Sequence, residues 1–249
     1  MAAARRWSRD EAMLVFRLYC ELPFGQMDHR NADVIRVAAL IQRTPSSVAM
    51  KLANFAHLDP AMRDRGIRGM ANVSALDREI AEQFAMNWEA SVEATSAASM
   101  VTDEPETLAV LEGIPTEARV VARVRLTQSF FRRTVLASYD FTCSACAISR
   151  PALLNAGHIK PWSTDEKART NPRSGISFCV LHDRAFDRGL ITVLPSYELR
   201  VTADLMGLSA IPVARAAFSD LAGSRIRLPS KFQPHREFIE YHNVHVYKG

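Results

Sequence analysis

The sequence predicts an α+β protein in which a helical N-terminal domain precedes a domain of short strands and short helices, and three observations predict this. Residues 7–90 carry apolar residues at helical spacing together with helix-start signals. Residues 91–114 are small, polar and acidic, which is typical of an exposed linker. From Pro115 onward, short apolar runs are separated by turn residues. We therefore expect a helical domain over residues 1–92, an acidic linker over 93–114 and a second domain over 115–249.

The composition is that of a folded protein, with 48% hydrophobic and 23% charged residues. The net charge of +4 is unevenly distributed, because residues 115–249 hold 19 Lys and Arg against 11 Asp and Glu. This excess of positive charge suits a polyanionic partner such as nucleic acid. No apolar run approaches the length of a membrane span, and the N-terminus turns polar too early for a secretory signal. We therefore expect a cytoplasmic location and no membrane partner.

The N-terminal half shows four helical segments. The first begins with a capping box, in which the side chains of Ser8 and Glu11 each bind the other residue's free amide. A second helix is expected around residues 31–40, a third directly after its N-cap Thr44, and a fourth over about 74–90.

The Trp7-Ser8 start and the turn over residues 43–48 resemble Myb/SANT-like or helix-turn-helix bundles. In such bundles the third helix can enter the major groove of DNA. The alternative is a plain helical bundle that packs on the second domain or pairs two chains. Lys51 is the only Lys or Arg of the third helix, which is little charge for reading DNA.

The second domain opens with residues 117–140, which we interpret as a short strand leading into a helix. Within it, Arg123, Arg125, Arg132 and Arg133 form a basic cluster. This cluster could grip phosphates, or it could be the solvated face of a helix.

Two ligand pairs have the spacing of a tetrahedral zinc site. Two residues separate Cys143 from Cys146, and two separate Cys179 from His182. Zinc would explain how a loop-rich region with little core keeps its shape, whereas in the alternative Cys146 and Cys179 are simply small buried residues. A thioredoxin-like redox role for the first pair is excluded, because the surrounding βαβ pattern is absent.

His158 is the leading candidate for a catalytic base. It follows an apolar run and precedes Pro161, so we place it at the end of a short strand where the chain turns. A histidine is neutral near pH 7 and can take a proton from water, which is what a phosphodiester hydrolase needs to activate its nucleophile. The alternative is a histidine that only hydrogen-bonds a nearby carbonyl. Trp162 beside it could stack on a base or cover the small core.

Asp183 and Asp187 are four residues apart at an expected helix start, so both carboxylates would face the same side. Two oxygen ligands suit Mg²⁺ or Mn²⁺, which would neutralise a scissile phosphate and stabilise the leaving oxygen. Asp187 could instead form an ion pair with Arg184 or Arg188. His182 could serve either zinc or this second cation.

These segments together resemble the HNH endonuclease family. The stretches AGHIKPW (156–162), NPRSG (171–175) and LHDRAFDRGL (181–190) are similar to the AHI-x-PW, NP-x-NG and LH-x-RAFDRGL segments of one branch. The resemblance covers most of residues 120–195. It implies a ββα-metal fold, in which a β-hairpin and a helix hold one divalent cation, and metal-assisted hydrolysis of phosphodiester bonds. It matches His158 to the general base and places Asp183 where the metal-binding helix begins.

Two positions depart from the family's pattern. Ser174 replaces the asparagine before the glycine, which leaves Asn171 to hold the connecting loop so that His158 points at the metal. Gly157 stands where many HNH enzymes carry an Asp or His ligand. The rival interpretations are a non-catalytic DNA-binding regulator with a zinc-stabilised degenerate HNH scaffold, and a structural adaptor.

The motifs as a whole predict an HNH endonuclease that acts on DNA, and the resemblance suggests a restriction or phage-defence nuclease. Cutting both strands would need two sites, so a homodimer is expected for that reaction and a monomer for nicking. The residues predicted to act are His158, Asn171, His182 and Asp183 in catalysis; Cys143, Cys146, Cys179 and His182 on zinc; Asp183 and Asp187 on Mg²⁺ or Mn²⁺; and Arg125, Arg132, Arg133, Lys160, Arg184 and Arg188 on nucleic acid.

Overall fold

The computed structural model describes residues 5–64, 66, 73–96 and 116–249. By their internal contacts, residues 1–130 and 131–249 form two compact units. The division falls inside helix α7 (Thr116–Ser138), after the expected start of the second domain, so the expected domain limits stay predictions. Of the expected linker, residues 93–96 belong to a helix, and the remainder lies outside the described residues.

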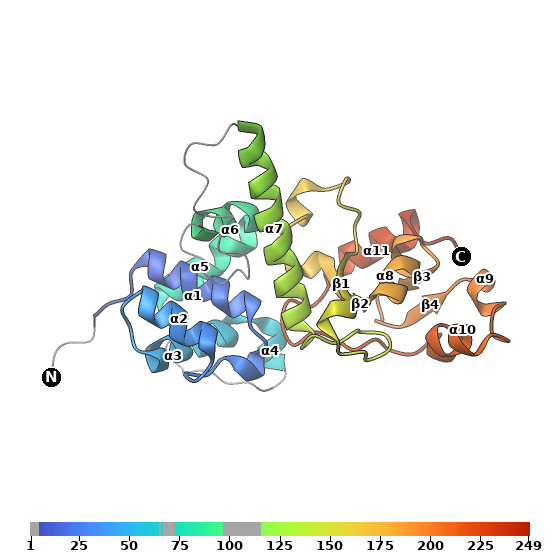
Figure 1. The fold of residues 1–249 in the computed structure, drawn as a ribbon, viewed down its shortest axis with the longest axis horizontal. Coiled ribbons are helices and arrows are strands. Elements are labelled where there is room, and N and C mark those ends of the chain that lie inside the picture. The colour runs from blue at the N-terminus through green and yellow to red at the C-terminus, as the bar shows by residue number, and fades with distance from the viewer. Residues whose placement is uncertain (1–4, 65, 67–72, 97–115) are drawn as a thin grey trace. The chain divides into compact units, whose positions relative to one another are not determined.

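The described residues of the N-terminal unit are mostly helical (Figure 1). The expected helices are present, except that the stretch over 74–90 is two helices, because Asn87 leaves the helical conformation with φ −150°. A further short helix, α4, was not expected. The elements before α7 are α1 (Arg9–Glu21), η1 (Phe24–Gln26), α2 (Ala32–Leu40), α3 (Pro45–Leu58), α4 (Pro60–Asp64), α5 (Ala75–Met86) and α6 (Trp88–Ser96).

Helix α1 packs against α2, α3, α5 and α6 and is the centre of this unit. It begins with the expected capping box, because Ser8 Oγ accepts from the amide of Glu11 and the Glu11 carboxylate accepts from the amide of Ser8. Phe16 of α1 is 4% exposed and its ring meets those of Phe55 on α3 and Phe84 on α5. One aromatic side chain therefore joins three helices through buried apolar surface.

Two ion pairs are buried in this unit. Arg17 Nε donates to Glu21 at 3.0 Å within α1. Lys51 Nζ on α3 lies 2.6 Å from Asp77 Oδ1 on α5, and the two side chains are 5% and 0% exposed. Lys51 is the only Lys or Arg of α3, so this helix offers no exposed Lys or Arg to a phosphate. The Myb-like interpretation stays a prediction, and this contact weakens it.

Helix α7 corrects one expectation, because the segment expected to begin as a strand is helical over all 23 residues. Its valines favour a strand locally, but the surrounding Ala, Arg, Leu and Gln are strong helix formers. Arg125 falls in the part of α7 that belongs to the N-terminal unit, and Arg133 is half-buried in the part that belongs to the C-terminal unit. Within the described ranges, the structure contains no helix of the length and apolarity that crossing a membrane requires.

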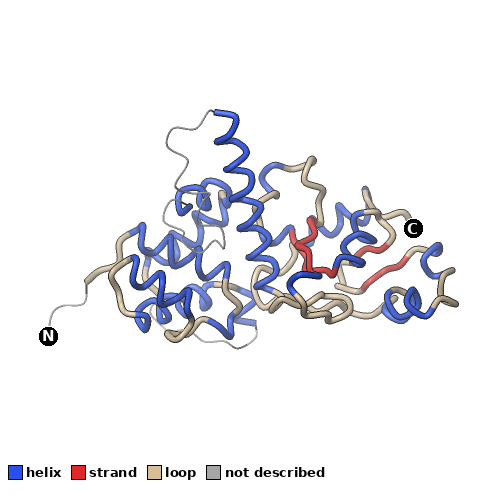
Figure 2. The backbone as a smooth tube through the Cα atoms, viewed as in Figure 1, coloured by secondary structure: helices blue, strands red, loops and turns tan. Residues whose placement is uncertain are grey.

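The C-terminal unit contains the expected β-hairpin and helix. Strand β1 (Leu154–His158) pairs antiparallel with β2 (Gly175–Cys179), so that His158 lies opposite Gly175. Helix α8 (Val180–Asp187) begins directly after β2 and packs on both strands, which gives a ββα arrangement (Figure 2). The mixed helix and small-sheet fold expected from the sequence is confirmed.

The remaining elements of this unit surround the ββα core. A second antiparallel pair follows α8, and α11 packs on its first strand. Buried apolar side chains from α7, the strands, α8 and α11 form one continuous core. The elements are η3 (Pro151–Leu153), η4 (Glu166–Ala168), η5 (Pro172–Ser174), β3 (Ile191–Val193), β4 (Leu199–Val201), α9 (Ala203–Met206), α10 (Pro212–Ala217), η6 (Ser219–Leu221) and α11 (Arg236–His245).

His242 joins α11 to α8. Its ring stacks on Phe186 with the centroids 3.7 Å apart, and its Nε2 lies 3.2 Å from the carbonyl oxygen of the same residue. A carbonyl can only accept, so Nε2 carries the proton and Nδ1 accepts from the hydroxyl of Thr192 at 2.8 Å. Burial lowers the pKa of His242 to about 4, so the ring is neutral at neutral pH.

The buried pair of Lys51 and Asp77 gives a stability prediction. Lys51→Met should lower the free energy of unfolding by about 3–5 kcal/mol, because it leaves the buried carboxylate of Asp77 without its cation. The control is the exposed pair of Arg9 and Glu79, in which Arg9→Ala should cost less than about 1 kcal/mol. Urea unfolding followed by circular dichroism measures both, and similar losses in the two variants would contradict the prediction.

The pKa of His242 gives a pH prediction. Between the unfolded pKa of 6.5 and the folded pKa of about 4, the unfolded chain binds a proton that the folded chain does not bind. The stability from this group is therefore present above pH 6.5 and is lost as the pH falls toward 4. Lowering the pH from 7 to 5 should cost roughly 2 kcal/mol at this residue. In urea titrations His242→Gln should lose less stability over this range than the parent, and equal losses would refute the assignment.

Candidate functional site

A cleft of about 470 Å³ lies beside the end of β1 and helix α8. The end of β1, the loop after it, α8 and α11 supply its walls. The structure places five of the predicted residues around this cleft: His158, Asp183, Arg184, Asp187 and Arg188. The candidate base, the two candidate metal ligands and two candidate phosphate ligands therefore share one space.

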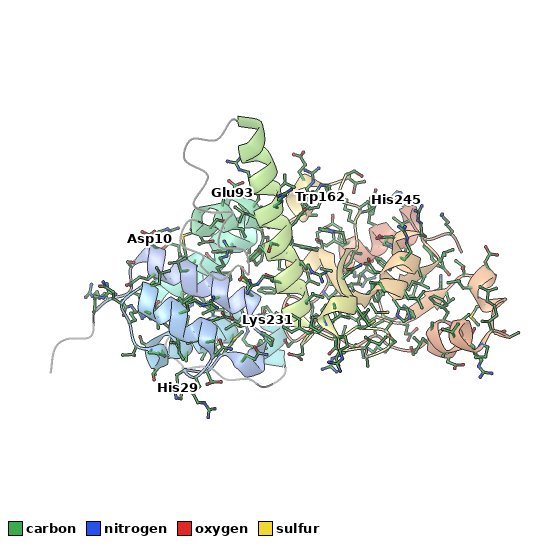
Figure 3. The ribbon with its side chains drawn as sticks, in the orientation of Figure 1. Asp10, His29, Glu93, Trp162, Lys231 and His245 are labelled. Atoms are coloured by element: carbon green, nitrogen blue, oxygen red, sulfur yellow. The ribbon has the colours of Figure 1, made fainter. Side chains whose placement is uncertain are left out.

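His158 is the last residue of β1, as expected. Its Nε2 lies 3.0 Å from the carbonyl oxygen of Arg169, so Nε2 carries the proton and Nδ1 keeps its lone pair. The ring stacks on Phe131 with the centroids 3.9 Å apart, and the ring of Trp162 meets it at nearly a right angle. Trp162 is drawn in Figure 3, on the loop that follows β1.

The environment of His158 keeps its ring neutral and reachable. Burial lowers its pKa, although the carbonyl of Arg169 and the charge of Asp183 oppose this effect. The side chain is only half-buried and lines the cleft. A carbonyl holds the ring, as the alternative interpretation expected, but this bond uses only Nε2. His158 can therefore accept a proton at Nδ1.

Asp183 lies in the first turn of α8, with its carboxylate against β1. Its Oδ2 accepts from Nδ2 of Asn155 at 2.8 Å. Its Oδ1 is shielded from solvent and has no hydrogen-bond partner among the described residues. Burial is the main cause that raises the pKa of this carboxyl. A buried carboxylate oxygen without a partner, beside a cleft, is a group that a divalent cation would satisfy.

Asp187 lies one turn further along α8 and also lines the cleft. Burial and the negative charge of Asp183 raise its pKa, while the charges of Arg184 and Arg188 lower it. Neither arginine is within ion-pair distance of Asp187 in the part of the chain that the structure describes. Two carboxylates on one helix face, of which one raises the pKa of the other, suit a shared cation.

Cys143, Cys146, Cys179 and His182 form a second site. Their ligand atoms all lie within 4.8 Å of one another, an arrangement that can hold a metal ion. His182 Nδ1 is 3.1 Å from Cys179 Sγ, and Cys146 Sγ is 3.8 Å from Cys179 Sγ. A zinc tetrahedron with Zn–S bonds of ~2.3 Å places its sulfurs ~3.8 Å apart, so the donor set and its spacing both fit zinc.

His182 belongs to this cysteine cluster and not to the cleft. Its Nε2 lies 2.8 Å from the carbonyl oxygen of Ala217, so Nε2 carries the proton and Nδ1 presents its lone pair to the sulfurs. The side chain is 1% exposed and does not line the cleft. Of the two roles left open for His182, the geometry supports the zinc ligand and gives no support to a role on the catalytic cation.

The pKa values of the three thiols bear on how the cluster would bind a cation. The hydrogen bond between Cys143 and Cys179 raises the pKa of Cys143 and lowers the pKa of Cys179, so Cys179 is the more readily ionised thiol. Burial raises the pKa of the Cys146 thiol. A zinc ion would displace the remaining protons, because it binds thiolates.

Asn171 lies in the loop between β1 and β2. Its Oδ1 accepts from the amide of Arg173 at 3.0 Å and so begins η5. The fully buried Ser174 donates to the carbonyl of Ala168 at 2.6 Å in the same loop. This loop also supplies the Arg169 carbonyl that holds His158. Asn171 does not line the cleft, so its influence on catalysis stays a prediction that acts through the loop.

The predicted phosphate ligands differ in their exposure and in the partners that they already have. Arg184 and Arg188 are exposed and line the cleft. Lys160 is in an ion pair with Asp165 at 2.9 Å. Arg132 donates to a backbone carbonyl of the β1 strand at 2.8 Å. Lys160 and Arg132 therefore already have partners, whereas Arg184 and Arg188 are the cations best placed for a phosphate.

Asn155 is the site residue that the sequence analysis missed. Its bond to Asp183 joins residues 28 apart in the chain, so no local spacing reveals it. The only signal was a polar amide directly after the apolar run that leads into β1. The stack of Phe131 on His158 was missed for the same reason, because it depends on how α7 meets β1.

The cysteine cluster gives a metal prediction. Purified protein should contain about one zinc ion per chain by elemental analysis, because four protein ligands complete a tetrahedral site. Cys146→Ser should lose most of this zinc and melt at a lower temperature, since zinc binding stabilises the folded state. Cys20→Ala is the matched control, because Cys20 lies in α1 and is not part of the cluster. Full zinc content in Cys146→Ser would argue against this site.

Comparison with known families agrees with this geometry. Residues 143–194 match a family model described as HNH endonuclease. The matched segment contains the cysteine cluster, β1, β2, α8 and the cleft carboxylates. No curated protein matches the chain. The resemblance to HNH endonucleases is confirmed for residues 143–194, which are similar to that family.

Proposed function

We propose that the chain is a metal-dependent endonuclease that hydrolyses phosphodiester bonds in DNA. One observation carries the proposal: His158, whose Nδ1 is left unprotonated, and Asp183, whose Oδ1 has no hydrogen-bond partner among the described residues, line the same cleft as two exposed arginines. A base for water, a ligand for a cation and a positive charge for phosphate are the three components that this hydrolysis needs.

In this reaction His158 is the general base. Nδ1 accepts a proton from water while the water oxygen bonds to phosphorus and the P–O bond to the leaving oxygen breaks. The carbonyl of Arg169 stabilises the positive charge that forms on the ring, because it accepts a hydrogen bond from Nε2. The stack on Phe131 holds the plane of the ring. The leaving oxygen takes up a proton from solvent, and the proton on Nδ1 then passes to solvent, which restores the base.

Asp183 and Asp187 would hold the divalent cation, Mg²⁺ or Mn²⁺, which supplies positive charge against the phosphate and the leaving oxygen. Asp183 keeps Oδ1 for this purpose because Asn155 occupies Oδ2. A zinc ion in the cysteine cluster would be structural, because four protein ligands leave no position for water.

The charge distribution supports a nucleic-acid substrate. Arg184 in α8 and Arg188 directly after it are exposed at the cleft, within the half of the chain that carries the positive excess. One such site cuts one strand, so the chain nicks DNA as a monomer and would cut both strands as a homodimer. A restriction or phage-defence role follows from the family resemblance and is part of the proposal.

The rival function is a non-catalytic DNA-binding regulator. Such a protein would bind DNA without a divalent cation and leave it intact. The buried Lys51 removes the only Lys or Arg that α3 could offer to a phosphate. The open base in the cleft has no purpose in a regulator, so the observations favour the nuclease.

A plasmid-cleavage assay tests this function. The parent chain should nick or linearise plasmid DNA in Mg²⁺ or Mn²⁺ and leave it intact in a chelator. His158→Ala should lower the rate by about 10²–10⁴-fold, because general-base catalysis is lost. It should remain folded, with a moderately lower melting temperature because the stack on Phe131 is lost, and should keep the DNA affinity of the parent.

The matched control is His235→Ala, which removes an exposed histidine of the same unit outside the cleft and should cut at the parental rate. Cutting by His158→Ala at the parental rate would overturn the mechanism. Tight DNA binding by the parent with no cutting in either cation, on methylated or unmethylated plasmid, would support the regulator. An RNA substrate in a parallel assay separates a DNA nuclease from an RNA nuclease.

A further inference from the structure

We propose that Asn155, held by Arg132, is a positioning residue that presents one oxygen of Asp183 to the catalytic cation. The inference rests on the proposed function and extends it to two residues that are not among those lining the cleft. Asn155 is half-buried in β1, and its amide reaches the carboxylate of α8 across the strand–helix contact.

The bond between Asn155 and Asp183 occupies one carboxylate oxygen and leaves the other available. A carboxylate only accepts, so Nδ2 of Asn155 donates to Oδ2 over 2.8 Å. This bond fixes the rotation of the carboxylate about its last torsion. Oδ1 is left without a partner, and it is the oxygen that a cation in the cleft would take.

Arg132 decides which way the amide of Asn155 faces. Its Nη1 lies 3.5 Å from Oδ1 of Asn155, and its Nη2 donates to the carbonyl of Leu154 at 2.8 Å. A guanidinium only donates, so the amide oxygen must face Arg132 and the amide nitrogen must face Asp183. Arg132 therefore donates to the amide oxygen of Asn155, and the amide nitrogen of Asn155 donates to Asp183. The reverse orientation of the amide would bring donor against donor and acceptor against acceptor.

The carboxylate of Asp183 occupies space that is open because Gly157 has no Cβ. A Cβ at position 157 would lie 2.6 Å from Oδ1 of Asp183, closer than any real contact of this kind. The glycine that departs from the family's pattern is thus the residue that lets Oδ1 approach β1. The carboxylate is confined by the glycine on one side and by the amide of Asn155 on the other.

Burying the charged carboxylate of Asp183 costs free energy, which a bound cation would offset. Burial disfavours the ionised form of Asp183, and the hydrogen bond from Asn155 opposes that effect by favouring the charged carboxylate. Loss of the amide would leave both oxygens buried without a donor. The carboxyl would then be able to rotate away from this position, which would weaken its bond to a cation.

The test measures Mn²⁺ binding to the zinc-loaded full chain by electron paramagnetic resonance, without DNA, and cleavage of plasmid across Mn²⁺ concentrations. Asn155→Ala and the nearly isosteric Asn155→Leu should raise the dissociation constant for Mn²⁺ by about 10–100-fold, as loss of a ligand's supporting hydrogen bond does. The cleavage rate at saturating Mn²⁺ should stay within a few-fold of the parent. Arg132→Met should shift the constant in the same direction by a smaller factor.

Ser149→Ala, at an exposed position before β1, is the matched control and should leave both curves unchanged. Parental Mn²⁺ affinity in both Asn155 variants, or a lower rate that excess Mn²⁺ does not restore, would overturn the positioning role. Asp183→Ala separates the two proposals. Loss of Mn²⁺ binding in that variant beside parental binding in Asn155→Leu rejects only the positioning role. Absence of Mn²⁺ binding in the parent itself rejects the proposed catalytic metal and this inference with it.

Discussion

The first turn of helix α8 is the constraint on which both sites of the C-terminal unit depend. Cys179 directly precedes the helix and His182 lies in its first turn, so the cysteine cluster fixes where α8 begins and how it is rotated about its axis. Asp183 is the next residue, and that rotation aims its carboxylate at β1. An ion in the cluster would therefore set the position of a ligand in the cleft, although the two sites share no side chain.

The imidazole rings of three histidines in this unit make the same backbone hydrogen bond in three different surroundings. In His158, His182 and His242 the Nε2 atom donates to a backbone carbonyl, which leaves Nδ1 as the acceptor in each ring. The surroundings of Nδ1 then decide the outcome. His158 lines an open cleft and its Nε2 is occupied, whereas Nδ1 lies beside sulfurs in His182 and beside a threonine hydroxyl in His242. These surroundings suit a candidate base, a candidate metal ligand and a core residue.

The parts of the site that follow local rules could be predicted from the sequence. The two spaced ligand pairs, the strand end at His158 and the helix that carries Asp183 and Asp187 all depend on residues close in the chain, where spacing fixes geometry. The capping box at Ser8 was predictable for the same reason. Each of these elements was found where the sequence placed it.

Contacts between distant segments could not be predicted. The burial of Lys51 against Asp77 and the bond from Asn155 to Asp183 depend on how separate elements pack, and a single sequence carries no record of that. The choice between two roles for His182 needed the position of Ala217, which is 35 residues away. The strand expected at the start of α7 failed differently, because the helix formers around its valines outweighed their local preference.

The bonds already made by Arg132 and Lys160 have a consequence for how the cleft would respond to ionic strength. Each cation that pairs with a phosphate releases condensed counterions, and only Arg184 and Arg188 at the cleft walls are exposed for such a pairing. Two such pairings correspond to a slope of about −2 in a plot of log affinity against log salt. If the affinity for nucleic acid fell much more steeply with salt, most of the phosphate contacts would lie outside the cleft.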